Sequence, residues 1–187
     1  MNWAFFIIVA WFSLGLELGL RDALGLGSSG IAPSFAIALL VFVAMHAPRH
    51  IALWTGLALG LALDLTRAGV SAGETGVSTI AVIGPGALGC LLAAQLIVTV
   101  RAMMMRRSPL AAAAMGFSAA AIANLVIAGV LTARSWYDPA IEVSATAEMT
   151  SRLASAVYTG VLTPIVVLAL APLTPFFGFA PGAVRAS

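Results

Sequence analysis

Apolar residues occur along this chain in long runs, and short polar segments separate the runs. An α-helix needs about 20 mostly apolar residues to cross the hydrocarbon core of a bilayer, with a range of about 17–25. The candidate runs approach that length and are Trp3–Leu20, Ile31–Met45, Ile51–Leu65, Gly84–Val100, Leu110–Thr132 and Leu153–Leu173. The pattern predicts an all-α fold, a polytopic membrane helix bundle of about six transmembrane helices, in which residues 1–187 form a single integral membrane domain.

Proline, glycine and polar residues mark the expected breaks between these helices. Pro33 is expected in the first turn of the second helix, where a missing N–H costs little. Thr66–Gly76 is expected to end the third helix as a polar hinge, and Val77–Ile83 to form an extended or re-entrant piece. Ala133–Arg152 is expected to form a polar segment outside the helices, and Pro164 to kink the last helix.

The composition supports a membrane environment. Hydrophobic residues make up 61% of the chain, charged residues 9%, and the mean hydropathy is +1.08. A soluble domain has about 45–50% apolar and about 25% charged residues. So few charged residues could not cover the outside of a water-soluble fold of this length, whereas lipid tolerates an apolar exterior.

Arginine supplies all the positive charge, because the nine basic residues include no lysine. The net charge of +2 is too small for a nucleic-acid partner. The cluster Arg101, Arg106 and Arg107 lies directly after a predicted helix, where basic residues weigh most in the positive-inside rule. It favours an orientation in which both termini are cytoplasmic.

Two motifs of catalytic proteins occur here in the wrong context. Gly25–Gly30 matches the dinucleotide fingerprint G-x-G-x-x-G, but it joins two membrane helices instead of a strand and a helix. Ser29 also stands in a G-x-S-x string of the kind that intramembrane serine proteases use. Its only candidate bases, His46 and His50, lie at the opposite end of the next helix, about 30 Å away for a spanning helix.

The remaining chemistry-bearing residues form no catalytic or metal-binding set. Pro48 interrupts the helix that would align His46 and His50 as metal ligands, and Cys90 is the only cysteine. An aspartic membrane protease would need two neighbouring intramembrane aspartates. The chain has three aspartates, of which Asp64 lies in a predicted helix and Asp22 and Asp138 lie in predicted loops. We therefore predict no enzyme activity, no metal and no cofactor.

The third predicted helix carries the most informative pattern. Gly56, Gly60 and Asp64 are spaced by four residues and therefore share one helix face. Small residues at this spacing let another helix approach closely in a membrane, and an acid on the same stripe would face a packed interior. We predict a partner or helix-packing interface here. The alternative is that Asp64 lies at the membrane interface and pairs with Arg67.

The first predicted helix has a similar group, in which Glu17 lies between Gly15 and Gly19. We assign these three residues to the same kind of interface. The alternative for Glu17 is an ion pair with Arg21 at the surface. Two uncharged polar residues inside later helices, Gln95 and Asn124, are predicted to form interhelical hydrogen bonds in a polar interior.

The third-helix element resembles the rod shape-determining protein MreD family. That family has about this length and hydropathy, and it carries a Gly-Leu-x-x-Gly-Leu-x-x-Asp-like element at the end of its third helix. Here Gly56–Thr66 matches that element. Gly84–Gly89 is similar to the family's Leu-Gly-containing restart after the turn, and Pro33 is similarly placed. The segment Arg67–Ile83 between the two motifs is longer than in the family.

The resemblance implies a fold like that of the substrate-binding membrane components of vitamin transporters, in the bacterial cytoplasmic (inner) membrane. It also implies a role as a non-enzymatic scaffold or regulator of the cell-elongation machinery that makes peptidoglycan and maintains cell shape. The implied partners are an MreC-like bitopic protein, a RodA-type glycosyltransferase, a class-B penicillin-binding transpeptidase and an MreB-like actin homologue.

A small-molecule transporter, or its substrate-binding membrane subunit, is the alternative. Such a protein places convergent polar and aromatic groups in a central pocket. Gln95, Asn124, Trp54 and Tyr158 are the few candidates in this chain.

Overall fold

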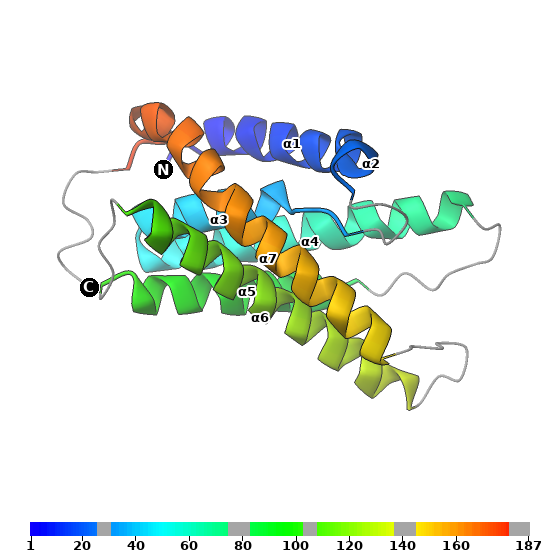
Figure 1. The fold of residues 1–187 in the computed structure, drawn as a ribbon. Helices are drawn as coiled ribbons and strands as arrows, with labels where there is room; N and C mark the ends of the chain where they lie inside the picture. The colour runs from blue at the N-terminus through cyan, green and yellow to red at the C-terminus, as the bar shows by residue number, and fades with distance from the viewer. Residues whose placement is uncertain (26–30, 75–82, 103–107, 137–144, 180–187) are drawn as a thin grey trace.

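The computed structural model describes residues 1–25, 31–74, 83–102, 108–136 and 145–179, and all regular elements in these ranges are helical (Figure 1). This confirms the predicted all-α fold class. The elements are α1 Trp3–Gly19, α2 Arg21–Leu24, α3 Phe35–His46, α4 Arg49–Glu74, α5 Pro85–Val100, α6 Pro109–Ser135, α7 Ala145–Leu170 and the 3-10 helix η2 Ala171–Phe177.

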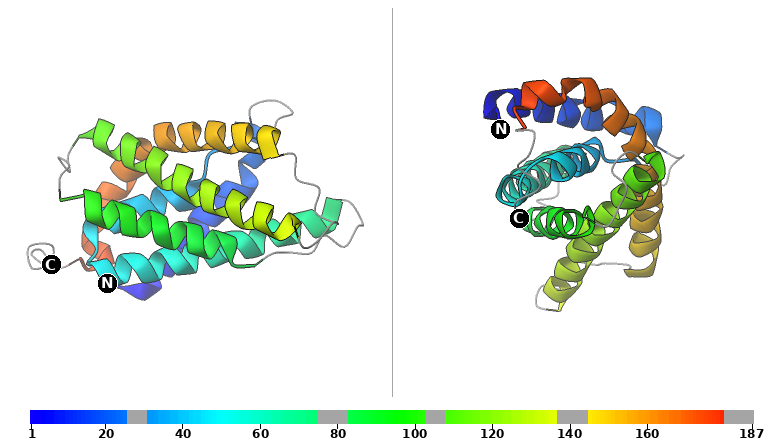
Figure 2. Two further views of the ribbon diagram at one scale, coloured as in Figure 1. Left: turned by 90° about the horizontal axis from the view of Figure 1, so that it is seen from below. Right: turned by 90° about the vertical axis from the view of Figure 1, so that its left-hand side faces the viewer.

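Helices α1, α4 and α5 run along nearly one direction, and α6 and α7 lie side by side at an inclination to it (Figure 1). Helices α4, α5, α6 and α7 pack in chain order, each on the next. Helix α3 lies between α1 and α5 (Figure 2, right) and also contacts α4, α6 and α7. The backbone N–H of Asn2 donates to the carbonyl of Phe177 at 2.8 Å, so the beginning of α1 and the end of η2 meet at one end of the bundle.

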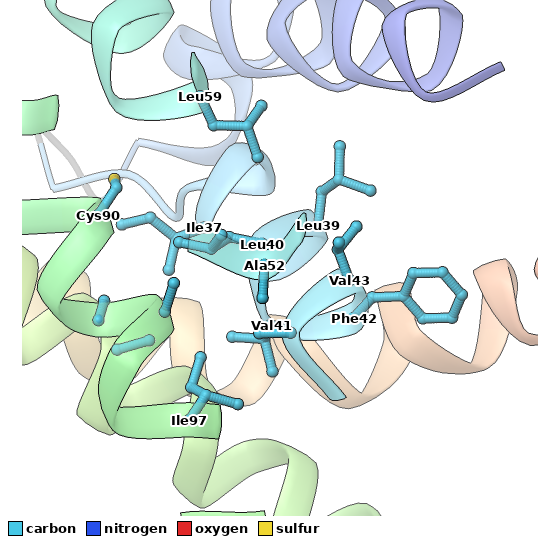
Figure 3. Packing of buried hydrophobic residues seen from close by; sticks show 14 of the residues in the cluster. Ile37, Leu39, Leu40, Val41, Phe42, Val43, Ala52, Leu59, Cys90 and Ile97 are labelled. Carbon is cyan, nitrogen blue, oxygen red and sulfur yellow. The ribbon is translucent and has the colours of Figure 1, made fainter. Parts of the chain in front are cut away.

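Helix α3 forms the centre of the core. Residues 36–45 are at most 3% exposed, and Figure 3 shows their side chains pointing outward in several directions toward the surrounding helices. A helix that is apolar on all sides belongs in a protein core or in a membrane, and here the surrounding helices enclose it. At 12 residues, α3 is only about 18 Å long, because each residue adds about 1.5 Å.

The outside of the bundle is apolar as well. Large hydrophobic side chains face outward from α1, where Trp11 is 79% exposed, and from α7, where Leu168 is 67% exposed. In the part of the chain that the structure describes, two stretches are long and apolar enough to cross a membrane, judged by length and composition: Pro109–Ala133 in α6 and Met149–Phe177 in α7 and η2. Helices α1, α3 and α5 are shorter apolar helices.

Several predicted boundaries are wrong. Pro33 precedes its helix instead of lying in the first turn, because Ser34 is the N-cap of α3 and accepts a hydrogen bond from the N–H of Ile37. The expected hinge at Thr66 is helical up to Glu74. The Thr66 hydroxyl donates to the carbonyl of Leu63 at 2.9 Å, so this polar residue satisfies its hydrogen bond within the helix.

The predicted polar segment Ala133–Arg152 is also helical at both ends, since α6 continues to Ser135 and α7 begins at Ala145. The start of α5 at Pro85 agrees with the predicted helix to within one residue. The predicted extended or re-entrant piece Val77–Ile83 lies outside the described residues, except for Ile83. Pro164 lies inside α7.

Candidate functional site

Asp64 binds the beginning of α5 with its carboxylate. The carboxylate accepts hydrogen bonds from the backbone N–H groups of Gly84 at 2.8 Å, Gly86 at 3.0 Å and Ala87 at 3.4 Å. These N–H groups belong to the first turn of a helix, where no intrahelical acceptor exists and the helix dipole favours a negative charge. Asp64 is 8% exposed. It therefore caps α5 from the neighbouring helix α4.

The need for this external cap follows from the local sequence. The N-cap position of α5 is Gly84, which has no side chain to bind the free N–H groups and has a φ of 128°. Glycine is the residue that adopts this backbone conformation readily. Pro85 then begins the helix with a fixed φ and no N–H of its own.

The two glycines of the α4 stripe bring α4 and α5 into backbone contact. A β-carbon on Gly56 would lie 2.9 Å from the carbonyl oxygen of Cys90. A β-carbon on Gly60 would overlap the carbonyl oxygen of Gly86 and lie 2.6 Å from the Cα of Ala87. In turn, a β-carbon on Gly86 would overlap the Asp64 carboxylate. The predicted stripe Gly56, Gly60 and Asp64 thus lies against α5 of the same chain.

The structure describes backbone partners for Asp64. The side chain of Arg67 lies outside the described residues, so the alternative pairing of Asp64 with Arg67 stays a prediction. The described partners are backbone N–H groups 20 or more positions further along the chain. One signal in the sequence could have indicated them. A helix that begins Gly84-Pro85-Gly86 has no capping side chain of its own and needs an acceptor from elsewhere.

Glu17 has an equivalent role at the beginning of α3. Its carboxylate accepts hydrogen bonds from the Ser34 hydroxyl at 3.0 and 3.1 Å and from the N–H of Ala36 at 3.1 Å. The flanking Gly15 and Gly19 differ from the α4 glycines, because a β-carbon at either position would meet no described atom within 4 Å. Neither glycine approaches a described neighbour closely, so the interface assigned to these two glycines stays a prediction.

Gln95 and Asn124 each form a hydrogen bond to a neighbouring helix. The Gln95 side-chain oxygen accepts from Nε of Arg49 at 3.2 Å, and the Asn124 amide donates to the carbonyl of Arg152 at 3.1 Å. Both residues are half-buried. Asn124 and Arg152 also line a small hollow between α6 and α7 whose other walls are apolar: Ala121, Leu125, Ala128, Met149 and Leu153.

Sequence reasoning missed the position of Arg101. We counted it with the arginines of a cytoplasmic loop, but it is 4% exposed and its guanidinium donates to the carbonyls of Ala44, at 2.8 Å, and Ala47. These carbonyls lie at the end of α3. Sequence reasoning also missed further close contacts at small residues: Gly89 with Ala123, Gly116 with Thr163, and Gly160 with Phe117.

The described contacts of His46 are with a backbone carbonyl and with aromatic rings. The Nδ1 atom of His46 is 2.8 Å from the carbonyl oxygen of Phe42, and its ring stacks on the ring of Phe179 at a centroid distance of 6.1 Å. His50 is exposed at the beginning of α4. Among the described residues, no group of three or more histidine, cysteine or acidic side chains is placed to hold a metal ion. What the described geometry supports is helix capping and close helix packing.

Comparison with known proteins gives no assignment, since no protein-family model, no curated protein and no solved structure matches the chain.

Proposed function

We propose that this chain is a multi-pass protein of the bacterial cytoplasmic membrane and a non-enzymatic scaffold or regulator of the cell-elongation peptidoglycan machinery, as in the MreD family. The observation that carries the proposal is the contact of Asp64 with Gly84 and Gly86. The two segments on which the resemblance rests, Gly56–Thr66 and Gly84–Gly89, are far apart in sequence and meet in one structural unit. This is what a motif with a common structural purpose requires.

The outer surface supports the membrane part of the proposal. Exposed apolar side chains cover the outward faces of α1, α4 and α7, including Trp11, Trp54 and Ile165. Soluble monomers rarely show apolar patches larger than a few hundred Å². The described residues contain six helices longer than 10 residues, and Asn2 and Phe177 meet at one end of the bundle. A first helix and a last helix that meet at one end are what an even number of membrane crossings, with both termini on one side, would produce.

The capping pattern supports a scaffold in preference to a catalyst. The two acids with described contacts in the bundle, Asp64 and Glu17, both accept backbone N–H groups at helix beginnings. A carboxylate that is occupied in this way stabilises the positions of helices. In the proposed complex, the rigid bundle presents its apolar faces to the transmembrane helices of an MreC-like protein, a RodA-type glycosyltransferase and its class-B transpeptidase, with an MreB-like filament on the cytoplasmic side.

Depletion of the protein in its native host tests this function. We expect rod-shaped cells to widen and round up as the protein is lost, and a plasmid copy to restore the cell width. Normal cell width at complete depletion would contradict the proposal. The transporter alternative makes a different prediction, because depletion would then leave the width unchanged in rich medium and create a requirement for one nutrient in minimal medium.

A further inference from the structure

The small hollow between α6 and α7 opens to the outside of the bundle. Its apolar walls come from one face of each helix, with residues spaced by three or four positions: Ala121, Leu125 and Ala128 on α6, and Met149 and Leu153 on α7. The three larger side chains are 43–58% exposed, and the space between the walls is about 250 Å³. The hollow therefore faces the surroundings of the bundle and not its core.

Two polar residues lie among these apolar walls. The Asn124 amide donates to the carbonyl of Arg152 at 3.1 Å, which joins α6 to α7 at this level. Arg152 is half-buried and lines the hollow. A guanidinium carries a permanent positive charge and five N–H donors, so it can bind an anion while it keeps a second contact. The hollow thus combines apolar space with one cationic group.

Arg152 lies near one end of a stretch that is long enough to cross a membrane. This stretch begins at Met149 and ends at Phe177. Because helical side chains lean toward the N-terminus of their helix, we expect Arg152 to reach toward the beginning of α7, away from the membrane centre. The inference rests on the membrane part of the proposed function, which places this guanidinium near the lipid headgroups and the apolar walls beside the acyl chains.

The chemistry of the hollow matches a lipid with a negatively charged headgroup. A planar guanidinium binds phosphate through two parallel hydrogen bonds, and phosphate is the anion that a bilayer presents at this depth. The apolar walls suit an acyl chain, whereas water would find few polar partners between them. A zwitterionic lipid gains less from the site, because its own cationic group competes with Arg152 for the phosphate.

We propose that the hollow is a binding site for one anionic phospholipid. The phosphate binds the Arg152 guanidinium, and one acyl chain lies between α6 and α7, which run side by side (Figure 2, left), in contact with Leu125 and Ala128. The beginning of α7 lies at the opposite end of the bundle from the contact of Asn2 with Phe177 (Figure 1). With both termini in the cytoplasm, the bound lipid belongs to the outer leaflet.

Native mass spectrometry of the full-length protein in detergent micelles tests this site. The first probe is phosphatidylglycerol, which is anionic, and the second is phosphatidylcholine with the same acyl chains, which is zwitterionic. Glycerol phosphate, which has a phosphate but no acyl chain, is the third. We expect one phosphatidylglycerol to bind about tenfold more tightly than phosphatidylcholine, and an excess of glycerol phosphate to leave it bound.

Removing the charge of Arg152 should remove this selectivity. In Arg152→Ala, we expect the affinity for phosphatidylglycerol to fall to within about twofold of that for phosphatidylcholine. Arg152→Gln, which keeps the length of the side chain, replaces it with the same expectation if the alanine variant does not accumulate. Arg21→Ala is the matched control, because Arg21 is an exposed arginine just beyond the end of α1, and it should keep the wild-type selectivity.

Filling the hollow should weaken binding while the charge stays in place. Ala128→Leu adds a larger side chain to the wall, and we expect it to reduce the affinity for both lipids by about threefold or more. Ala133→Leu adds the same side chain at an exposed position of α6 that does not line the hollow. It should leave both affinities unchanged.

Several results would overturn the proposal. Equal affinities of the wild-type chain for the two lipids would mean that any acyl chain, or a partner helix, covers the hollow. Unchanged selectivity in the Arg152 variants would place the anion elsewhere, unchanged binding in Ala128→Leu would place the acyl chain elsewhere, and displacement by glycerol phosphate would indicate a site for phosphate alone. These results would leave the cell-width test standing, whereas recovery of the chain from the soluble fraction would contradict the proposed function itself.

Discussion

Replacing Asp64 tests the contact between α4 and α5 most directly. Asp64→Ala removes the acceptor of two close hydrogen bonds, from Gly84 and Gly86, and of a third, longer one from Ala87. A buried donor left without a partner costs about 1–3 kcal/mol. Because the Gly84 N–H is only part-buried, we expect Asp64→Ala to lower the free energy of unfolding by about 2–4 kcal/mol.

Asp64→Asn separates the effect of the charge from that of the acceptor. Asparagine keeps one oxygen that can accept from the first turn of α5, but it loses the negative charge at the helix beginning. A charge at a helix end contributes about 0.3–1 kcal/mol when exposed and up to about 2 kcal/mol when partly buried. We therefore expect Asp64→Asn to cost about 1–2 kcal/mol, less than the alanine variant.

The assay is unfolding of the purified protein in mixed micelles with increasing SDS, followed by the fluorescence of its four tryptophans. His50→Ala, at an exposed position of the same helix, is the control and is expected to change the free energy of unfolding by less than about 0.5 kcal/mol, as exposed substitutions usually do. If Asp64→Ala also stays within that margin, the carboxylate does not stabilise the α4–α5 contact and the reasoning about the cap is wrong.

Three further predictions concern packing, topology and chemistry. Gly60→Leu places a side chain where even a β-carbon collides with α5, so we expect the protein to be strongly destabilised or absent from membranes, whereas Leu61→Ile, at an exposed neighbouring position, should accumulate normally. Cysteines at Trp136 and Ser108, which flank α6 at opposite ends, should react with an impermeant thiol reagent from outside the cell at Trp136 only; labelling of both would show that α6 does not cross the membrane. Ser29→Ala should leave cell width and protein level unchanged, and loss of function at a normal level would instead indicate a catalytic serine.

The helices were predictable where apolar residues form runs bounded by proline or arginine. The run after Pro85 is the clearest case, since both its beginning and its end agree with α5. Polar residues misled the boundary prediction at Thr66, because a threonine hydroxyl can bond within its own helix and does not end it. Composition alone does not distinguish a polar helical turn from a loop.

The stripe of Gly56, Gly60 and Asp64 was predictable as a face of close approach, because a spacing of four residues is a property of the helix itself. Its neighbour was not predictable, because no local pattern says which later helix returns to that face. The same limit applies to Arg101. Its position after an apolar helix is typical of a cytoplasmic loop residue, whereas its actual partners, Ala44 and Ala47, lie more than 50 positions earlier in the chain.

The central proposal is that the chain acts as a scaffold of the cell-elongation machinery, and affinity capture from native membranes tests it most directly. The chain carries a C-terminal tag, is expressed from its own promoter, and is purified in mild detergent after brief crosslinking. We predict that an MreC-like bitopic protein and a class-B transpeptidase are captured with it in comparable molar amounts. Recovery of the intact wild-type chain in quantity, without either protein, would contradict the proposal.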